Sequence, residues 1–359
     1  MARKIPLYLL VGAVLGAFLF PGNAQADGND NAAFEGLIEV SEVLIDVLAT
    51  NADGEVVPGL GVDDFIVQED GEEVQVTSVS YYTTRYDDAA ALGEGEVPAS
   101  RYFVLFFQGP NGASYQASKI RQRLLAAREA QAWVEDAMSG SDWVAVVSYG
   151  SDLRIQQDFT QDRGSILYGI EAALAHRNIE KEDPRRRPPA SGMPSLLRHL
   201  PREKALRKAS RDMHSTLSTL AAATGYIVGR KNLVVFTHGF GGTPDEDFDR
   251  RRSPENDPQV ALNDHNVAVY PIHLGGRGVG QPHSAYLSEL AESTGGVYYE
   301  NLDHFREPLE KIADENYGYY VLSYQAQHPA GEVGYSRVEV RARDENVEVR
   351  ARQGYRYGL

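Results

Sequence analysis

The sequence predicts an α/β protein in which a doubly wound, mostly parallel sheet is flanked by antiparallel strands from both ends of the chain. Three patterns lead to this fold class. Short runs with period two occupy residues 37–83, apolar strand patterns alternate with helical patterns over residues 100–318, and period-two runs return over residues 319–352. Strands that alternate with helices indicate a parallel sheet, whereas consecutive alternating strands indicate antiparallel sheets.

Size and composition set limits on the class of protein. The chain has 359 residues, 42% of them hydrophobic, and can bury a sizeable core, so we expect two structural units. It contains no cysteine, which excludes disulfides, thiolate metal sites and cysteine nucleophiles. The formal net charge is −16, and such an acidic protein is repelled by nucleic acid and by anionic lipid. Nucleic acid is therefore not an expected partner.

Residues 1–26 have the organisation of a secretory signal peptide. Arg3 and Lys4 precede an apolar run over residues 7–20, and a small-x-small triplet follows at residues 24–26. A membrane anchor is the alternative, but a helix needs about 20 apolar residues to cross a bilayer. We therefore expect export to the periplasm or the extracellular space, with no membrane span in the mature chain. Cleavage would remove both cations and no acid, and would change the net charge from −16 to −18.

The N-terminal β segment, residues 27–85, is a series of short strands with no helix between them. Residues 74–79 alternate with period two, and a further strand begins at Phe65. Asp53-Gly54 and Asp70-Gly71 provide tight turns, because glycine accepts the positive φ that such turns require. Alone, these strands form only part of a β-sandwich.

The central unit, residues 100–318, follows a linker rich in Ala, Gly and Glu. Runs such as 102–107 are almost continuously apolar, as expected for strands buried on both faces of a parallel sheet. The predicted strands are 102–107, 143–148, 233–236, 267–272 and 296–299, and the predicted helices are 115–137, 165–175, 203–223, 285–293 and 305–317. Residues 178–211 form an Arg- and Pro-rich insertion, which we interpret as a surface loop leading into a helix; recruitment of an acidic partner is the alternative.

The C-terminal segment, residues 319–359, returns to strand patterns. Residues 319–324, 335–343 and 347–352 are three predicted strands, and the last two alternate strictly. Tyrosines gather at the start of this segment, where their amphipathic rings are expected to pack the junction between the two units; a partner-binding surface is the alternative. We expect these strands to complete the sandwich begun by residues 27–85, with the central unit inserted.

Several motifs resemble those of a known protein family. Residues 46–60, followed by Asp64-Phe65 and Glu69-Asp70-Gly71, are similar to the leading segment of the VWA-related (von Willebrand factor A-type) proteins first catalogued in acidobacteria. The later landmarks occur in the family's order: Asp158-Phe-Thr160 with Asp162, Gly229-Arg-Lys-Asn-Leu-Val-Val235, Asn266–Ile272, Leu290–Gly296, Tyr319–Tyr324 and Arg350–Tyr355. The resemblance covers nearly all of the chain after residue 26 and implies a Rossmann-like VWA fold in an exported protein.

The resemblance also implies where a metal-ion-dependent adhesion site would lie, and this sequence departs from the family there. Family members often hold a divalent cation with Asp-x-Ser-x-Ser after the first strand, a Thr from a second loop and an Asp after the middle strand. Here Gln108 stands at the first Asp position and His238 at the last. Without these carboxylates a hard cation loses most of its attraction, so we expect no metal and no cofactor. Asn111, Ser114 and Thr216 complete a ligand-binding surface beyond the carboxyl ends of the strands; degenerate loops without a ligand are the alternative.

Other motifs give weaker signals. His238-Gly-Phe-Gly-Gly242 resembles the oxyanion-hole segment of α/β-hydrolases, but the chain has no Gly-x-Ser-x-Gly nucleophile elbow, so we expect no enzymatic activity. The acidic run 245–249 lacks the spacing of a calcium loop. The glycine-rich run 275–280 lacks the Walker lysine of a phosphate-binding loop. We interpret both runs as exposed connectors.

Together these features predict an exported VWA-domain protein that mediates protein–protein binding or adhesion without a bound divalent cation. The alternative is a structural or assembly component of an envelope complex, in which the sandwich makes the contacts and the VWA site is vestigial.

Overall fold

The computed structural model describes residues 42–84, 100–109, 117–175, 192–240, 257–275, 284–328 and 332–358. The expected signal peptide, the loop residues Asn111 and Ser114, and the acidic run 245–249 lie outside these ranges. Within them, no helix combines the length and the apolar character needed to cross a membrane.

A five-stranded sheet forms the centre of the chain, with the strand order β7-β6-β5-β8-β9. Its strands are β5 (Arg101–Gln108), β6 (Asp142–Tyr149), β7 (Leu153–Thr160), β8 (Lys231–Thr237) and β9 (Val267–His273). Neighbouring strands are parallel except β7, which runs antiparallel to β6. Because β8 and β9 are buried along their whole length, their apolar sequences suit strands covered on both faces. The predicted mostly parallel sheet is confirmed.

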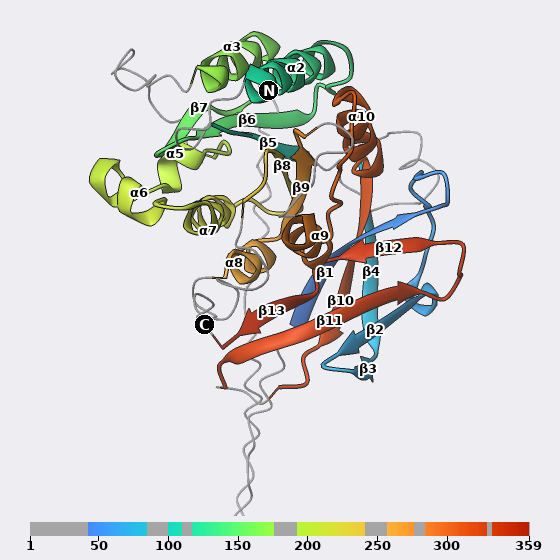
Figure 1. Cartoon of the computed structure of the whole chain (residues 1–359). Helices are drawn as coiled ribbons and strands as arrows, with labels where there is room; N and C mark the ends of the chain where they lie inside the picture. Colours follow the sequence, from blue (N-terminus) through green and yellow to red (C-terminus); the bar gives the residue numbers. More distant parts are fainter. Residues whose placement is uncertain are drawn as a thin grey trace, which may run out of the picture. The chain divides into compact units, whose positions relative to one another are not determined.

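Helices cover both faces of this sheet (Figure 1). One face carries α2 (Ala117–Asp136), α3 (Arg163–Leu174) and α10 (Arg306–Glu315), and the other carries α5 (Leu196–His199), α7 (Met213–Thr224), α8 (Pro258–Asp264) and α9 (Ser284–Ser293). On the first face, Trp133 and Ile170 share a hydrophobic cluster with Phe103. On the second, Leu217 and Leu287 share a cluster with Phe106. Alternate side chains of β5 thus serve two separate cores.

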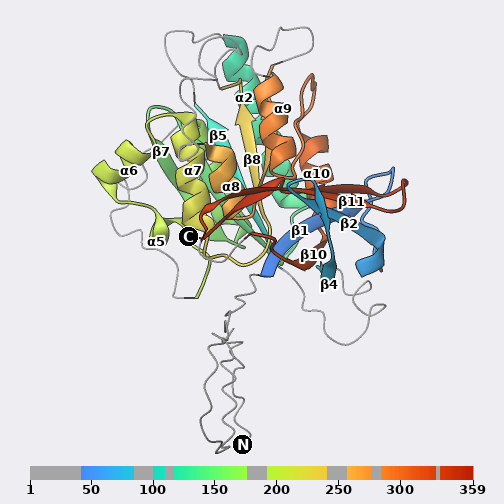
Figure 2. The same cartoon turned by 90° about the horizontal axis from the view of Figure 1, so that it is seen from below.

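Two four-stranded antiparallel sheets are built from strands at both ends of the described chain, with the orders β12-β1-β10-β4 and β13-β11-β2-β3. Their strands are β1 (Glu42–Thr50), β2 (Phe65–Glu69), β3 (Glu72–Val74), β4 (Val76–Thr83), β10 (Gly318–Gln325), β11 (Gly334–Ala342), β12 (Glu348–Ala351) and β13 (Gly354–Tyr357). Figure 2 shows β1, β4 and β10 close to β2 and β11. Side chains of both sheets, among them Ile45, Phe65, Leu322 and Val338, form one hydrophobic cluster.

The helix predicted over residues 203–223 is interrupted. The structure has α6 (Glu203–Ala209), a break at residues 210–212, and then α7. The Asp212 carboxylate accepts the backbone N–H of Ser215 at 2.8 Å, and the Asp212 N–H donates to the Ser215 hydroxyl at 3.2 Å. This reciprocal capping box starts a new helix inside an otherwise continuous helical pattern.

Buried polar side chains connect the parallel sheet to the antiparallel strands. Arg230, just before β8, donates to the Tyr270 hydroxyl of β9 at 3.2 Å and to the side-chain oxygen of Asn316, two residues before β10, also at 3.2 Å. The Asn266 amide donates to the Asp46 carboxylate of β1 at 2.6 Å. Burial raises the pKa of Asp46, against the opposing effect of this hydrogen bond. Since a buried polar group is stable only when paired, these bonds fix the register between the two parts.

Candidate functional site

The candidate site lies at the carboxyl edge of the parallel sheet, where β5 and β8 end side by side. Phe107 pairs with Phe236, so the next residues, Gln108 and Thr237, are neighbours. The Thr237 hydroxyl donates to the Gln108 side-chain oxygen. The Gly239 backbone N–H then donates to the Thr237 hydroxyl oxygen at 2.9 Å. The carbonyl of the Gln108 side chain is therefore engaged within the protein, and the whole residue is only 7% exposed.

Thr216 approaches the same edge from the first turn of α7. Its side chain is fully buried, and its hydroxyl donates to the Asp212 carbonyl at 2.6 Å. A hydrogen bond also joins it to Tyr149, the last residue of β6. Burial raises the pKa of the Tyr149 hydroxyl, and the nearby Asp212 carboxylate raises it further. Thr216 thus holds α7 against the strand ends and does not face solvent.

His238 follows Thr237 directly and is half-buried. Burial lowers the pKa of its ring from 6.5 to about 4, and the positive charges of Lys119 and Arg123 on α2 lower it as well. A hydrogen bond with the backbone of Lys119 opposes this shift, while the neighbouring His273 adds to it. The ring is therefore neutral at pH 7. Its Nε2 atom is buried and has no hydrogen-bond partner among the residues that the structure describes.

The structure thus brings Gln108 and His238 to one edge, as expected from the family resemblance and from the strand ends, with Thr216 beneath the surface. Asn111 and Ser114 belong to residues that the structure does not describe. In the described part of the chain, no group of three or more His, Cys, Asp or Glu side chains has an arrangement that could hold a metal ion.

An aromatic group beside this edge was not predicted. His214 on α7, Phe240 after β8 and Tyr286 on α9 face one another, with ring centroids 5.3 to 6.2 Å apart and edge-to-face geometry. Such pairs contribute about 1 kcal/mol each beyond the area they bury. The three residues are far apart in sequence. Of the three, only Phe240 belongs to a motif noted in the sequence, His238-Gly-Phe-Gly-Gly242.

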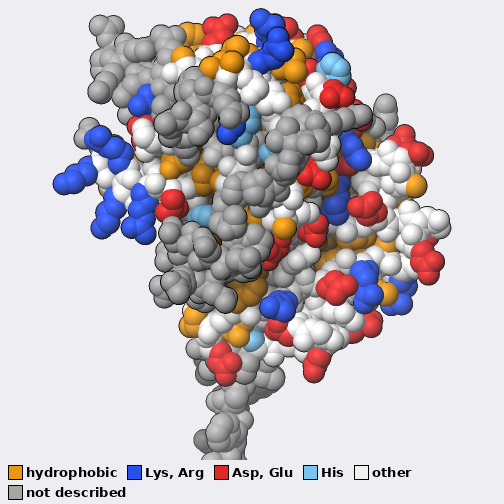
Figure 3. Space-filling view, in the orientation of Figure 1, with side chains coloured by type: hydrophobic (Ala, Val, Ile, Leu, Met, Phe, Trp, Pro, Cys, Tyr) orange, Lys and Arg blue, Asp and Glu red, His pale blue; other side chains and the backbone are white. Residues whose placement is uncertain are grey.

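The described part of the Arg-rich segment forms a second polar feature. Arg202, Lys204, Arg207 and Lys208 are exposed on and beside α6, and within the described ranges none of them takes part in an ion pair. Figure 3 shows Lys and Arg side chains gathered over this helix. These four cations therefore lie on and beside a short helix, and the Arg-rich run at 185–187, which we interpret as part of a surface loop, lies outside the described residues.

Comparisons with known proteins give remote likenesses only. No family model and no curated protein matches the chain. Among solved structures, BatB from Bacteroides thetaiotaomicron is 13% identical over 60% of this chain and 96% of its own, with a TM-score of 0.36. The proximal thread matrix protein 1 of the mussel byssus is 13% identical over 64% of this chain and 49% of its own, also with a TM-score of 0.36. The human COPII-coat protein Sec24c is 9% identical over 79% of this chain and 48% of its own, with a TM-score of 0.40. At these scores, no property of these proteins is transferred to the chain.

Proposed function

We propose that the chain is an exported VWA-type protein that binds a protein partner at the carboxyl edge of its parallel sheet. It does so without a divalent cation and catalyses no reaction. One observation supports the proposal above all: Gln108 and His238 occupy the positions where the resemblance expects carboxylates, and neither side chain carries charge at pH 7. The Gln108 oxygen is taken by Thr237, and the pKa of His238 is lowered to about 4.

The same edge offers other means of recognition. Ligands of doubly wound sheets bind beyond the carboxyl ends of the strands, where loops from several elements meet. Here the loop after β8 supplies His238, and the helices on that side supply the partly exposed His214 and Tyr286, which pack against the buried Phe240. Aromatic side chains dominate binding energy in protein interfaces. A metal-free contact of this kind is the proposed mode of binding.

The proposal includes the division of the chain. Residues 1–26 are the signal peptide, residues 100–318 are the VWA domain, and residues 27–85 and 319–359 together make the β-sandwich. The shared hydrophobic cluster of the two antiparallel sheets supports the sandwich assignment.

A metal titration tests the cation-free site. We expect Mg²⁺, Mn²⁺ and Ca²⁺ to leave the melting temperature of the purified protein unchanged, because a cation that binds only the native state must stabilise it. The variant carrying Gln108→Asp and His238→Asp is expected to gain saturable stabilisation by Mg²⁺, up to about 2.7 kcal/mol at 100 times the dissociation constant. Saturable stabilisation of the unmodified protein would overturn the proposal.

A second candidate function is a structural or assembly component of an envelope complex. The open groove beside the antiparallel sheets, described below, favours it. Pull-down of the tagged protein from an extracytoplasmic fraction, followed by mass spectrometry, separates the two functions. If changes at Gln108 and His238 leave capture intact while changes in the groove abolish it, the second function holds and the first fails.

A further inference from the structure

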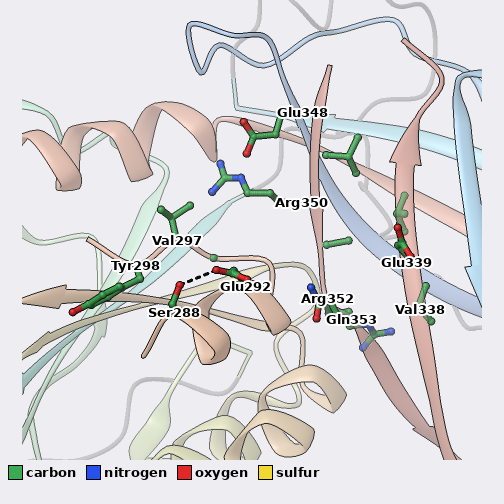
Figure 4. Close-up of a pocket in the computed structure, with 14 residues that line it drawn as sticks. Ser288, Glu292, Val297, Tyr298, Val338, Glu339, Glu348, Arg350, Arg352 and Gln353 are labelled. Atoms are coloured by element: carbon green, nitrogen blue, oxygen red, sulfur yellow. Dashed lines mark hydrogen bonds between the residues drawn. The ribbon is translucent and has the colours of Figure 1, made fainter. Parts of the chain in front are cut away.

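A groove runs between α9 and the antiparallel sheets (Figure 4). Its volume is about 400 Å³, and its walls are formed by α9, residues 296–298, residues 338–340 of β11 and residues 348–353. In Figure 4, Ser288, Glu292 and Tyr298 lie on the α9 side, and Val338 and Glu339 lie on the β11 side. β12 runs between these two walls.

Two strand edges border this groove without a pairing strand. Among the described strands, β12 pairs only with β1 and ends its sheet. β11 pairs with β13 over its first four residues and with β2 over its last five. The Val338 backbone N–H donates to the Gln353 carbonyl at 3.1 Å. From this bond onward β11 and β12 separate, because β12 pairs with β1 in the other sheet. An unpaired strand edge is a template for another extended chain, because its backbone donors and acceptors need partners.

The cations of the groove are already committed to the protein. Arg350 on β12 bonds the buried Glu315 of α10 at 2.6 Å. Arg352 donates to the carbonyl oxygens of Asn263 at 2.6 Å and of Leu44 at 2.7 Å. These contacts hold β12 in place. Glu315 balances the charge of Arg350, and the carboxylates of Asp46 and Asp264 lie close enough to act on the charge of Arg352.

The carboxylates of the groove are by contrast exposed along its length. Glu348 has no hydrogen bond or ion pair within the described residues. Glu292 accepts only the neutral Ser288 hydroxyl, at 2.7 Å. Glu339 pairs with Arg341 at 3.2 Å, but both side chains are more than half exposed, so this pair is weak. The groove therefore presents negative charge from both walls.

Apolar side chains complete the lining. Val338 and Val340 belong to the hydrophobic cluster of the antiparallel sheets, and Val349 and Ala351 pack against it. An extended peptide directs successive side chains to opposite sides. Val338 and Val340 are themselves buried, so one row would lie beside the partly exposed Val349 and Ala351 while the other meets the carboxylates.

We propose that this groove binds an extended peptide segment with alternating basic and apolar side chains, which adds as a strand to the free edge of β12. This is the strand-addition mode, in which backbone hydrogen bonds give affinity and side-chain pockets give specificity. The occupant is a segment of another protein. A second copy of this chain fits poorly, because its own alternating basic strand, β11 with Arg337 and Arg341, is already paired with β13 and β2, and because the whole chain carries a net charge of −16.

Fluorescence anisotropy tests this proposal with a labelled peptide of alternating lysine and valine. We expect saturable binding to the purified full chain, which weakens as salt is added because exposed charges are screened. A peptide of alternating glutamate and valine is expected to bind at least about tenfold more weakly. N-methylation of alternate backbone nitrogens in one register should abolish binding, and in the other register should leave it intact, since a paired strand directs alternate N–H groups to its neighbour.

Matched charge variants locate the site. The double variant Glu339→Lys with Glu348→Lys is expected to weaken binding of the lysine peptide about tenfold. The control Glu332→Lys with Glu345→Lys changes the net charge equally at exposed positions outside the groove lining, and should change binding less than about twofold. Equal losses in both variants, indifference to N-methylation, or a dimer in sedimentation that the peptide dissociates would each overturn the proposal. These variants do not change the carboxyl-edge site. The peptide experiment can therefore fail without affecting the metal titration that tests the proposed function.

Discussion

Lowering the pH should destabilise the protein through His238, whose ring is held neutral by its surroundings. The folded-state pKa is about 4, whereas an unfolded chain titrates near 6.5. Between pH 6.5 and pH 4 the His238 ring is protonated in the unfolded state but neutral in the folded state. The unfolding free energy is therefore unaffected by this group above pH 6.5 and falls as the pH is lowered toward 4.

The size of this loss follows from the two pKa values. One pKa unit corresponds to about 1.4 kcal/mol, so the interval amounts to about 3 kcal/mol. Because the ring is only half-buried, we expect solvent screening to reduce the loss to about 2 kcal/mol. For a protein whose total stability is roughly 10 kcal/mol, this is measurable by urea denaturation.

The assay compares the native sequence with the variant His238→Gln from pH 7 to pH 4. The difference in unfolding free energy between the two proteins isolates His238 from the other titrating groups, because those groups are common to both. Nuclear magnetic resonance of the ring protons reads the pKa directly, and the resonance absent from the variant spectrum identifies His238. A pKa of 6 or higher, or parallel stability profiles for the two proteins, would refute the reasoning.

Three further substitutions have defined expectations. Arg350→Met leaves the buried Glu315 with only its longer ion pair to Lys311, at 3.8 Å, and should lower the unfolding free energy by about 3 kcal/mol in urea; an unchanged midpoint would show that the Lys311 pair is sufficient. Gly295→Ala places a methyl group 2.9 Å from the Ala351 backbone at a residue with φ of +75°, and a loss of about 2 kcal/mol should appear as a lower melting temperature. Trp133→Ala opens a cavity in the core under α2 and should cost about 4 kcal/mol; a loss below 1 kcal/mol would mean that the core refills.

Periodicity predicted β5, β6, β8 and β9 well, because burial on both faces gives an unbroken apolar run. The strand predicted over residues 296–299 was wrong, since that segment makes only an isolated bridge from Tyr299 to Ile272. Periodicity did not predict β7, whose centre is polar. Gln156 and Asp158 are buried there. The Gln156 amide donates to the Ser148 hydroxyl at 2.8 Å, and the Asp158 carboxylate accepts the Ser195 hydroxyl at 2.6 Å. These partners lie on other elements, so no local pattern reveals that polar residues occupy a strand. The break before α7 was missed for a related reason, since its capping box stands within a helical pattern.

The sequence predicted the position of the candidate site, but not which of its side chains are buried. Strand ends placed Gln108 and His238 at one edge, because the carboxyl ends of parallel strands meet there. Sequence gave no sign that Thr216 is fully buried or that the Gln108 oxygen is taken by Thr237. Hydrogen bonds between distant elements decide which side chains remain available, and these depend on packing. The groove beside β12 could not be predicted either, because it depends on packing: it arises where β11 and β12 separate.

The position of β1 between β10 and β12 imposes an order on folding. β1 ends at Thr50, yet its two neighbours begin at Gly318 and Glu348. A chain made or delivered from its N-terminus must keep β1 unpaired until nearly all of it has emerged. The parallel sheet can close earlier, because its strands all lie between Arg101 and His273. Contacts of such long sequence separation form slowly, so we expect the final closure of β1 to limit the rate at which the native protein appears.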